Sequence, residues 1–210
     1  MITLHAFGRV HPFVHGETRD LRVQWALEEM GLPYDVRGWD HTAGETTGAE
    51  FSAISPFNQL PLIEDDGLVL TETGAILLHL AEKSGRLIPD DAEGRAHVRQ
   101  WVFAALATVE GPIQPFKLMD MGAMGDPGET RKFLLGWTHR VLGNLNRRLD
   151  GRDWIATDDF TVADLLLASV LRQIRHDDLM AGYPNVAALY ARAHARPAWR
   201  RTLELYAERL

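Results

Sequence analysis

A proline inside a short apolar run is the first residue whose placement could serve chemistry. Pro61 lies in the segment LPLIE, and a proline in a strand lacks the N–H that a ladder needs, so it is normally confined to an edge or a turn. An ordinary edge-strand or turn proline is one interpretation. The other is a cis Leu60–Pro61 bond, which turns the Leu60 N–H and C=O away from the sheet, where they can pair with a short peptide-like ligand.

The second candidate pair, Glu72 and Thr73, stands where a strand gives way to a helix. The first turn of a helix carries N–H groups without intrahelical partners and the positive end of the helix dipole, so it suits a ligand carboxylate. Thr73 adds a hydroxyl donor, and Glu72 can accept from a ligand ammonium group. The alternative is a plain helix cap, in which Thr71 or Thr73 bonds only to its own backbone.

The elements around these residues follow from hydrophobic periodicity and turn signals. Residues 2–6 and 34–36 predict short strands, and between them the sequence TRDLRVQWALEEMG predicts a helix capped by Thr18 or Asp20 and ended by Gly31. The polar stretch 38–51 predicts a loop with a short irregular helix. Asp66-Gly67 then splits two apolar runs as a hairpin turn does, and a helix follows as far as Gly85.

The rest of the chain has helical periods only. We expect helices over residues 93–119 (bent at Gly111-Pro112 and Pro115), 134–149, 161–174, 185–195 and 197–210, with a loop over 121–129. Thr161 and Asp164 have the spacing of a capping box. The sequence therefore predicts an α/β domain of order βαβαββα over residues 1–83, a Gly/Pro/Asp-rich linker over 84–92, and an all-α helical bundle over 93–210.

Composition excludes several classes of function. The chain has no cysteine, which rules out disulfides, cysteine-ligated metals and a protein thiol nucleophile. Its net charge of −7 is concentrated in residues 1–83 and does not match a nucleic-acid footprint. The scattered histidines predict no metal site. We find neither a signal peptide nor an apolar run long enough to span a bilayer, so the expected location is the cytoplasm, away from membranes.

Three segments together resemble the cytosolic glutathione transferases. They are SPFNQLPLIEDDGLVLTETGAILLHLAEK, WALEEMGLPYD on the first helix, and RDWIATDDFTVADLLLAS in the helical half. They occur in both halves of the chain and in the family's order. The resemblance implies a thioredoxin-like first domain, glutathione as co-substrate, a helical domain that contributes the pocket for a second substrate, and a homodimer.

The same resemblance implies roles for individual residues. The Leu60 main chain, beside Pro61, would hold the cysteinyl unit of glutathione, and Glu72 with Thr73 would hold its γ-glutamyl end. Gln59 could reach the glycyl carboxylate. His41, in the polar loop after the second strand, is a further candidate for this end of the ligand.

The group that activates the thiol departs from the family's pattern. A thiol of pKa about 8.5 is only about 3% ionised at pH 7, and one charge-assisted hydrogen bond with the helix end is enough to make it mostly thiolate. The family uses a Tyr, Ser or Cys near the first strand or helix, but residues 1–30 contain none of these. Thr18 is the nearest hydroxyl and Arg19 the nearest cation, so we name both as catalytic candidates. A helix cap for Thr18 and a surface ion pair for Arg19 are the structural alternatives.

Three functions remain open on this basis. The first is a glutathione transferase that conjugates the thiolate to a small apolar electrophile, as in detoxification. The second is a glutathione-dependent peroxidase or disulfide reductase that uses no protein cysteine. The third is a non-catalytic glutathione-binding or protein-interaction module, which the missing activator would favour.

Overall fold

The computed structural model describes residues 1–11, 14–122 and 128–209. The chain forms two compact units: one comprises Met1–Arg86 together with the chain from Ala195 onward, and the other comprises Leu87–His194. The first change of unit falls inside the segment 84–92 expected to be a linker. The end of the chain differs from the expected boundaries, because its last helix groups with the first unit.

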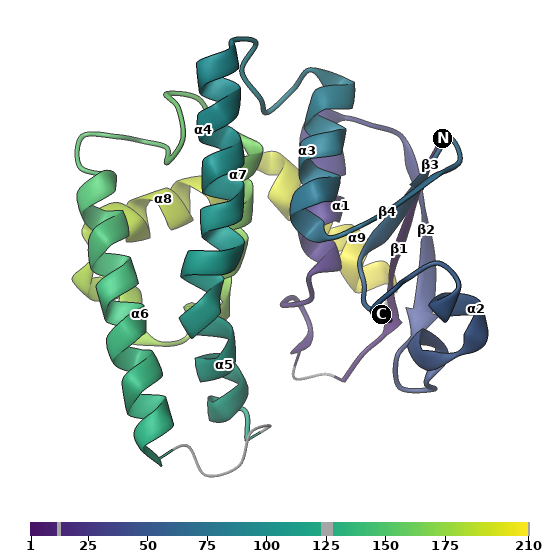
Figure 1. Cartoon of the computed structure of the whole chain (residues 1–210), viewed down its shortest axis with the longest axis horizontal. Helices are drawn as coiled ribbons and strands as arrows, with labels where there is room; N and C mark the ends of the chain where they lie inside the picture. The colour runs from purple at the N-terminus through teal and green to yellow at the C-terminus, as the bar shows by residue number, and fades with distance from the viewer. Residues whose placement is uncertain (12–13, 123–127, 210) are drawn as a thin grey trace. The chain divides into compact units, whose positions relative to one another are not determined.

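A four-stranded sheet is the centre of the first unit (Figure 1). The strand order is β2-β1-β3-β4, in which β1 and β2 are parallel and the other pairs antiparallel. The predicted element order is confirmed, with these bounds: β1 Ile2–Arg9, α1 Asp20–Met30, β2 Tyr34–Asp40, a 3-10 turn Glu45–Thr47, α2 Ala49–Ser52, β3 Leu62–Asp65, β4 Leu68–Thr71 and α3 Thr73–Ser84. Strands β1 and β2 run farther than expected because parallel pairing continues to Phe7 and Trp39.

The two faces of the sheet are covered by different elements (Figure 1). Leu4 and its partner Ile63 are fully buried on the face that α1 and α3 cover. The neighbouring pair, His5 and Leu62, points to the other face because side chains alternate along a strand. On that face lies a buried cluster that fixes α2 and the loop before β3; it comprises Trp39, Phe51, Leu60 and Leu62.

The start of α1 is not capped as the sequence suggests. The capping prediction for Thr18 or Asp20 is wrong: Arg19 occupies the N-cap position, and no side chain caps the helix there. Asp20 is instead fully buried, and its Oδ2 accepts from the Phe7 N–H at 3.3 Å and from the Arg209 guanidinium at 2.6 Å. The predicted C-terminus is confirmed, because Gly31 takes a left-handed conformation (φ 65°).

The hairpin between β3 and β4 forms where the sequence predicts it. Asp66 (φ 51°) and Gly67 (φ 89°) both have positive φ, as a tight hairpin turn of the primed type requires. Helix α3 then ends at Gly85, whose φ is 64°. These local signals are strong because few residues other than Gly, Asn and Asp accept such backbone angles.

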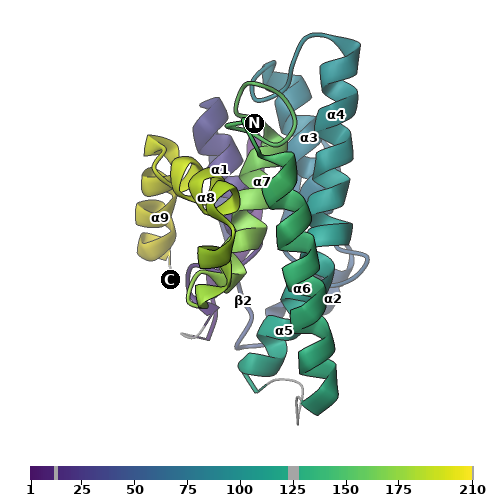
Figure 2. The same ribbon diagram turned by 90° about the vertical axis from the view of Figure 1, so that its left-hand side faces the viewer.

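The second unit is helical, as predicted; Figure 2 shows α6 beside α5. Its elements are α4 Ala92–Phe103, a π-helical segment Ala104–Val109, α5 Glu110–Asp120, α6 Gly128–Arg148, α7 Val162–Leu171, 3-10 turns Arg172–Ile174 and Asp178–Gly182, and α8 Pro184–His194. The single helix expected over 93–119 is interrupted by the π-helical segment Ala104–Val109, and both Pro112 and Pro115 lie within α5. Pro112 cannot donate to the carbonyl four residues earlier, which is consistent with a wider turn just before it. Residues 123–127 of the expected loop lie outside the described residues. No helix within the described ranges is long and apolar enough to cross a bilayer.

The predicted capping box of α7 is confirmed. Asp164 Oδ2 accepts from the Thr161 N–H at 2.9 Å and from the Thr161 hydroxyl at 2.8 Å, and its Oδ1 accepts from the Ile155 N–H at 2.6 Å. Asp164 is fully buried, and this burial raises the pKa of its carboxyl to about 6. The box therefore ties the loop before α7 to the helix through a buried acid.

Candidate functional site

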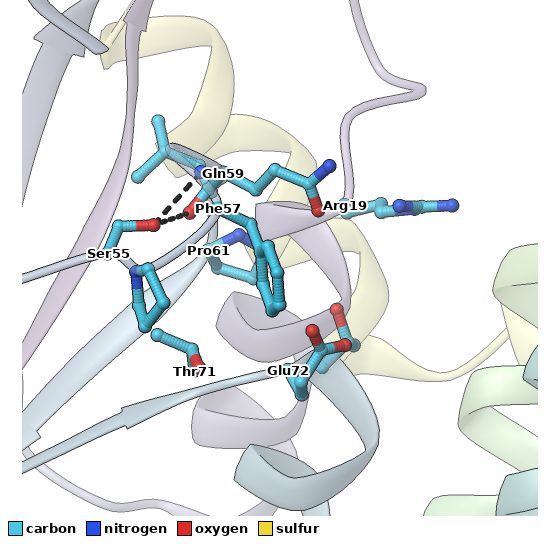
Figure 3. Close-up of a pocket in the computed structure, with 10 residues that line it drawn as sticks. Arg19, Ser55, Phe57, Gln59, Pro61, Thr71 and Glu72 are labelled. Carbon is cyan, nitrogen blue, oxygen red and sulfur yellow. Dashed lines mark hydrogen bonds between the residues drawn. The ribbon is translucent and has the colours of Figure 1, made fainter. Parts of the chain in front are cut away.

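A pocket in the first unit brings the predicted binding residues together (Figure 3). All of the predicted site residues except Thr18 and His41 line it. The full lining is Arg19, Ser55, Pro56, Phe57, Gln59, Leu60, Pro61, Thr71, Glu72 and Thr73. Residues from the start of α1, the loop before β3 and the junction of β4 with α3 thus meet in one place, although β2, β3 and β4 all lie between Arg19 and Thr73 in the chain.

Hydrogen bonds to Ser55 shape the loop before β3. The buried Ser55 hydroxyl accepts from the Gln59 N–H at 2.9 Å and donates to the Gln59 carbonyl at 3.1 Å, as the dashed lines in Figure 3 show. Asn58 adopts a positive φ of 53°, a conformation that asparagine tolerates better than most residues. This places Gln59 at the pocket with its backbone held at both polar groups.

Leu60 anchors the next step of the chain. Its side chain is 7% exposed and belongs to the buried cluster beneath α2. The Leu60–Pro61 bond is cis, and the ladder between β1 and β3 begins only at Leu62. The Leu60 main chain therefore stands at the pocket wall, outside the paired part of β3, as the ligand-binding interpretation requires.

The junction of β4 and α3 supplies the opposite wall. Glu72 is the N-cap residue of α3 and has φ 67° and ψ 115°, a region that a residue with a side chain rarely occupies. Thr73 opens the helix and is 6% exposed. Because the first-turn N–H groups of α3 have no partner within the helix, this wall offers donors and the positive end of a helix dipole beside the Glu72 carboxylate.

The two candidates for thiol activation lie in different surroundings. Arg19, at the N-cap of α1, lines the pocket, and Figure 3 shows its side chain extending from the end of the helix. Thr18 is not among the lining residues. Its hydroxyl donates to the Tyr206 hydroxyl of α9 (Pro197–Arg209) at 2.9 Å. Of the two candidates, only Arg19 therefore lies at the pocket itself, and Thr18 is its neighbour in the chain.

The remaining sequence candidates lie away from the pocket lining. His41 bonds through Nδ1 to the Thr46 hydroxyl at 3.1 Å, and its ring meets that of Phe7 edge-on at 5.7 Å. In the part of the chain that the structure describes, no three His, Asp or Glu side chains form a group that could hold a metal ion.

The pocket can bind a short peptide-like molecule by both ends. Main chain at Leu60, outside the paired part of β3, suits a peptide unit, the α3 N-terminus with Thr73 suits a carboxylate, and Glu72 suits an ammonium group.

Comparison with known proteins identifies the family of both halves of the chain. Residues 10–82 match the family model described as the glutathione S-transferase N-terminal domain, and residues 121–200 match the glutathione S-transferase C-terminal domain. The disulfide-bond oxidoreductase YfcG of Escherichia coli (strain K12) is 32% identical over 184 residues, covering 82% of this chain and 84% of that protein. The chain belongs to the cytosolic glutathione S-transferase superfamily. Within this superfamily, glutathione S-transferase D7 of Drosophila melanogaster is 26% identical over 190 residues, covering 87% of this chain and 83% of that protein.

Solved structures of this superfamily share the whole fold. A glutathione transferase from Burkholderia graminis, with two glutathione molecules bound per subunit, is 30% identical with a TM-score of 0.85 over 97% of this chain and 87% of that one. A glutathione transferase from Pseudomonas putida, with one glutathione disulfide bound per subunit, is 25% identical with a TM-score of 0.85 over 97% of this chain and 91% of that one.

Sequence reasoning missed several residues of this pocket. Ser55 shapes the loop, Phe57 is 74% exposed at the rim, and Thr71 lies at the end of β4. A serine-proline pair before a turn residue is a signal that could have drawn attention to Ser55. Nothing in the local sequence marks Phe57, because an exposed aromatic is recognised only once the surface is known.

Proposed function

We propose that this pocket binds glutathione and that the bound thiolate attacks a small apolar electrophile, so that the protein acts as a glutathione transferase. The observation that carries the proposal is the meeting of the Leu60–Pro61 segment, the Glu72–Thr73 wall and Arg19 in one pocket of a superfamily member. Glutathione is then the co-substrate. The Leu60 main chain holds its cysteinyl unit, Glu72 and Thr73 its γ-glutamyl end, and Gln59 its glycyl carboxylate.

The chemistry asked of the protein is modest. A shift of about two pKa units in the bound thiol corresponds to about 2.7 kcal/mol, which a single charge-assisted hydrogen bond and a helix end can supply. Arg19 is the cation at the pocket, and Thr18 is the hydroxyl beside it. In this proposal the sulfur–carbon bond forms as the leaving group departs with the electron pair, and side chains of residues 93–210 supply the surface for the electrophile.

Calorimetric titration with glutathione, followed by a conjugation assay on an aromatic halide, tests the proposal. We expect binding at micromolar to millimolar glutathione and turnover that rises with pH as the thiol ionises. The variants Thr18→Ala and Arg19→Ala identify the activator, because loss of that group lowers turnover far more than binding. Binding without turnover on a broad electrophile panel would favour the non-catalytic module, and no binding at all would overturn the proposal.

The second candidate function is reduction of disulfides by glutathione. It is favoured by the 32% identity to an Escherichia coli disulfide-bond oxidoreductase and by related structures that hold two glutathione molecules or glutathione disulfide. Since the chain has no cysteine, both reacting sulfurs must come from the ligands. The thiolate of one glutathione attacks a mixed disulfide of glutathione, glutathione disulfide forms, and the released thiolate takes up a proton. Faster turnover with a small glutathionyl disulfide than with any conjugation substrate would select this function.

We also propose that the protein works as a homodimer in the cytoplasm. The proposal rests on membership of the superfamily. Light scattering during gel filtration tests the assembly: a mass near twice that of one chain is expected, and the mass of one chain at micromolar concentration would contradict it. Fractionation of the source cells tests the location.

A further inference from the structure

Helix α9 returns from the far end of the chain and lies along α1 in the first unit (Figure 1). The two helices run in opposite directions, because the start of α9 meets the end of α1. There, the Arg196 guanidinium binds both carboxylate oxygens of Glu29 at 2.8 and 2.9 Å. One turn farther on, the rings of Trp199 and Trp25 lie 4.9 Å apart between their centroids.

The end of α9 reaches the start of α1. Arg209 Nη2 donates to Asp20 Oδ2 at 2.6 Å, in a pair whose side chains are 10% and 0% exposed. A buried ion pair adds little net stability compared with apolar packing, but it strongly penalises any arrangement in which one charge loses its partner. The pair therefore fixes which residues of α9 stand beside the first turn of α1.

Tyr206 holds the segment that leads into that turn. Its side chain is 3% exposed, and its hydroxyl oxygen accepts from the Thr18 hydroxyl at 2.9 Å and from the Gly16 N–H. The next residue, Arg19, lines the pocket. One phenol on the last helix thus bonds to two groups of the short segment from which both candidates for thiol activation come.

We propose that Tyr206 is a positioning residue that orients the Thr18 hydroxyl toward the sulfur of bound glutathione. This inference rests on the proposed function of the pocket. The Gly16 N–H occupies one lone pair of the Tyr206 oxygen, and a hydroxyl hydrogen can turn to suit its partner. When a thiolate lies beside Thr18, the Thr18 proton turns to the sulfur and the Tyr206 O–H donates to the Thr18 oxygen. No proton leaves either residue, and each bond of such a chain polarises the next.

The charged residues around this series of hydrogen bonds suit a neutral phenol at Tyr206. Asp20 and Arg209 stand beside Tyr206 and pair with each other, while Arg19 and Glu72 line the pocket. Burial raises the pKa of the Tyr206 hydroxyl. The phenol therefore stays protonated, as a donor to Thr18 must.

The test compares Tyr206→Phe with Tyr34→Phe. Tyr34 is a matched control, because its half-buried hydroxyl also bonds to α1, accepting from Gln24 at 3.2 Å and donating to Glu28 at 2.8 Å, yet it does so away from the helix start. Thiolate absorbance against pH gives the pKa of the bound thiol, and turnover against pH gives kcat and KM. For Tyr206→Phe we expect the thiol pKa to rise by about 0.5–1 unit, and kcat below that pKa to fall about three- to tenfold. KM for glutathione should stay within about twofold, since the binding residues are untouched.

Several outcomes decide the matter. A thiol pKa in Tyr206→Phe equal to that of Tyr34→Phe and wild type would overturn the inference, since a purely structural role changes stability but not ionisation. If Tyr206→Phe does not fold, Thr18→Val removes the receiving hydroxyl instead and should raise the thiol pKa by the same amount; an unchanged pKa there overturns the inference equally. Absence of glutathione binding in the wild-type protein, seen before any variant is compared, would instead refute the proposed function.

Discussion

Burial of Asp164 in the α7 capping box should make the free energy of unfolding depend on pH. In Asp164→Asn the side chain keeps its shape and loses its charge. One acceptor oxygen is replaced by an amide NH2 group, which cannot accept a hydrogen bond from the N–H donor that it faces. Asp164 now accepts from Ile155 and Thr161 at 2.6–2.9 Å. Leaving one of these buried N–H groups without an acceptor costs about 1–3 kcal/mol. On hydrogen bonding alone, the variant is less stable at every pH.

Burial of the charge acts in the opposite direction. It raises the pKa of the Asp164 carboxyl from 3.8 to about 6, although hydrogen bonds to the carboxylate oppose the rise. Between about pH 4 and pH 6 the native state therefore holds a proton that the unfolded chain has released, and stability falls as pH rises wherever the native state binds more protons. A difference of about two pKa units corresponds to about 3 kcal/mol of stability lost across this window.

Asparagine has no such titration, so the disadvantage of Asp164→Asn should be largest near pH 4 and shrink by about 3 kcal/mol by pH 7. Urea unfolding followed by circular dichroism at several pH values measures the difference between the two proteins. Asp158→Asn, an exposed aspartate close by, controls for the change in net charge. A disadvantage that grows with pH would refute the reasoning, because it would mean that the charge-assisted hydrogen bonds outweigh the burial of the carboxylate.

Three further predictions use other groups. Burial lowers the pKa of His194 to about 4, so the native state resists protonation, and the free energy of unfolding should fall by about 3 kcal/mol between pH 6.5 and 4. His194→Gln should flatten that loss in acid unfolding curves. Parallel curves for the two proteins would contradict the prediction. Glu72→Gln should weaken glutathione binding about 10- to 100-fold in calorimetry, but weaken binding of an analogue without the α-amino group much less; equal losses would show that Glu72 does not contact the ammonium. Arg196→Met leaves the Glu29 carboxylate, 6% exposed, without its bidentate partner and should lower the free energy of unfolding in urea by about 2 kcal/mol. Arg201→Met, in which the lost arginine is half exposed, should lower it by less than about 1 kcal/mol. Equal losses would contradict the argument from burial.

Much of the binding wall could be predicted from local sequence. The Asp66-Gly67 turn and the Gly85 exit demand backbone angles that few residues adopt, so the hairpin and α3 could be read directly, and with them the position of Glu72 and Thr73. The predicted cap of α1 was wrong because Asp20 is one residue inside the helix, where a buried partner far along the chain decides what it does.

Local chemistry thus determined the elements of this protein, the position of Glu72 and Thr73 at the start of α3 and the capping box of α7, since propensity, turn angles and periodicity act within a few neighbouring residues. Tertiary structure decided which unit α9 joins and what the Thr18 hydroxyl touches. An amphipathic pattern shows that a helix buries one face, but it does not say against which surface. The contact of Tyr206 with Thr18, 188 residues apart, exists only because the folded sheet and α1 present that surface.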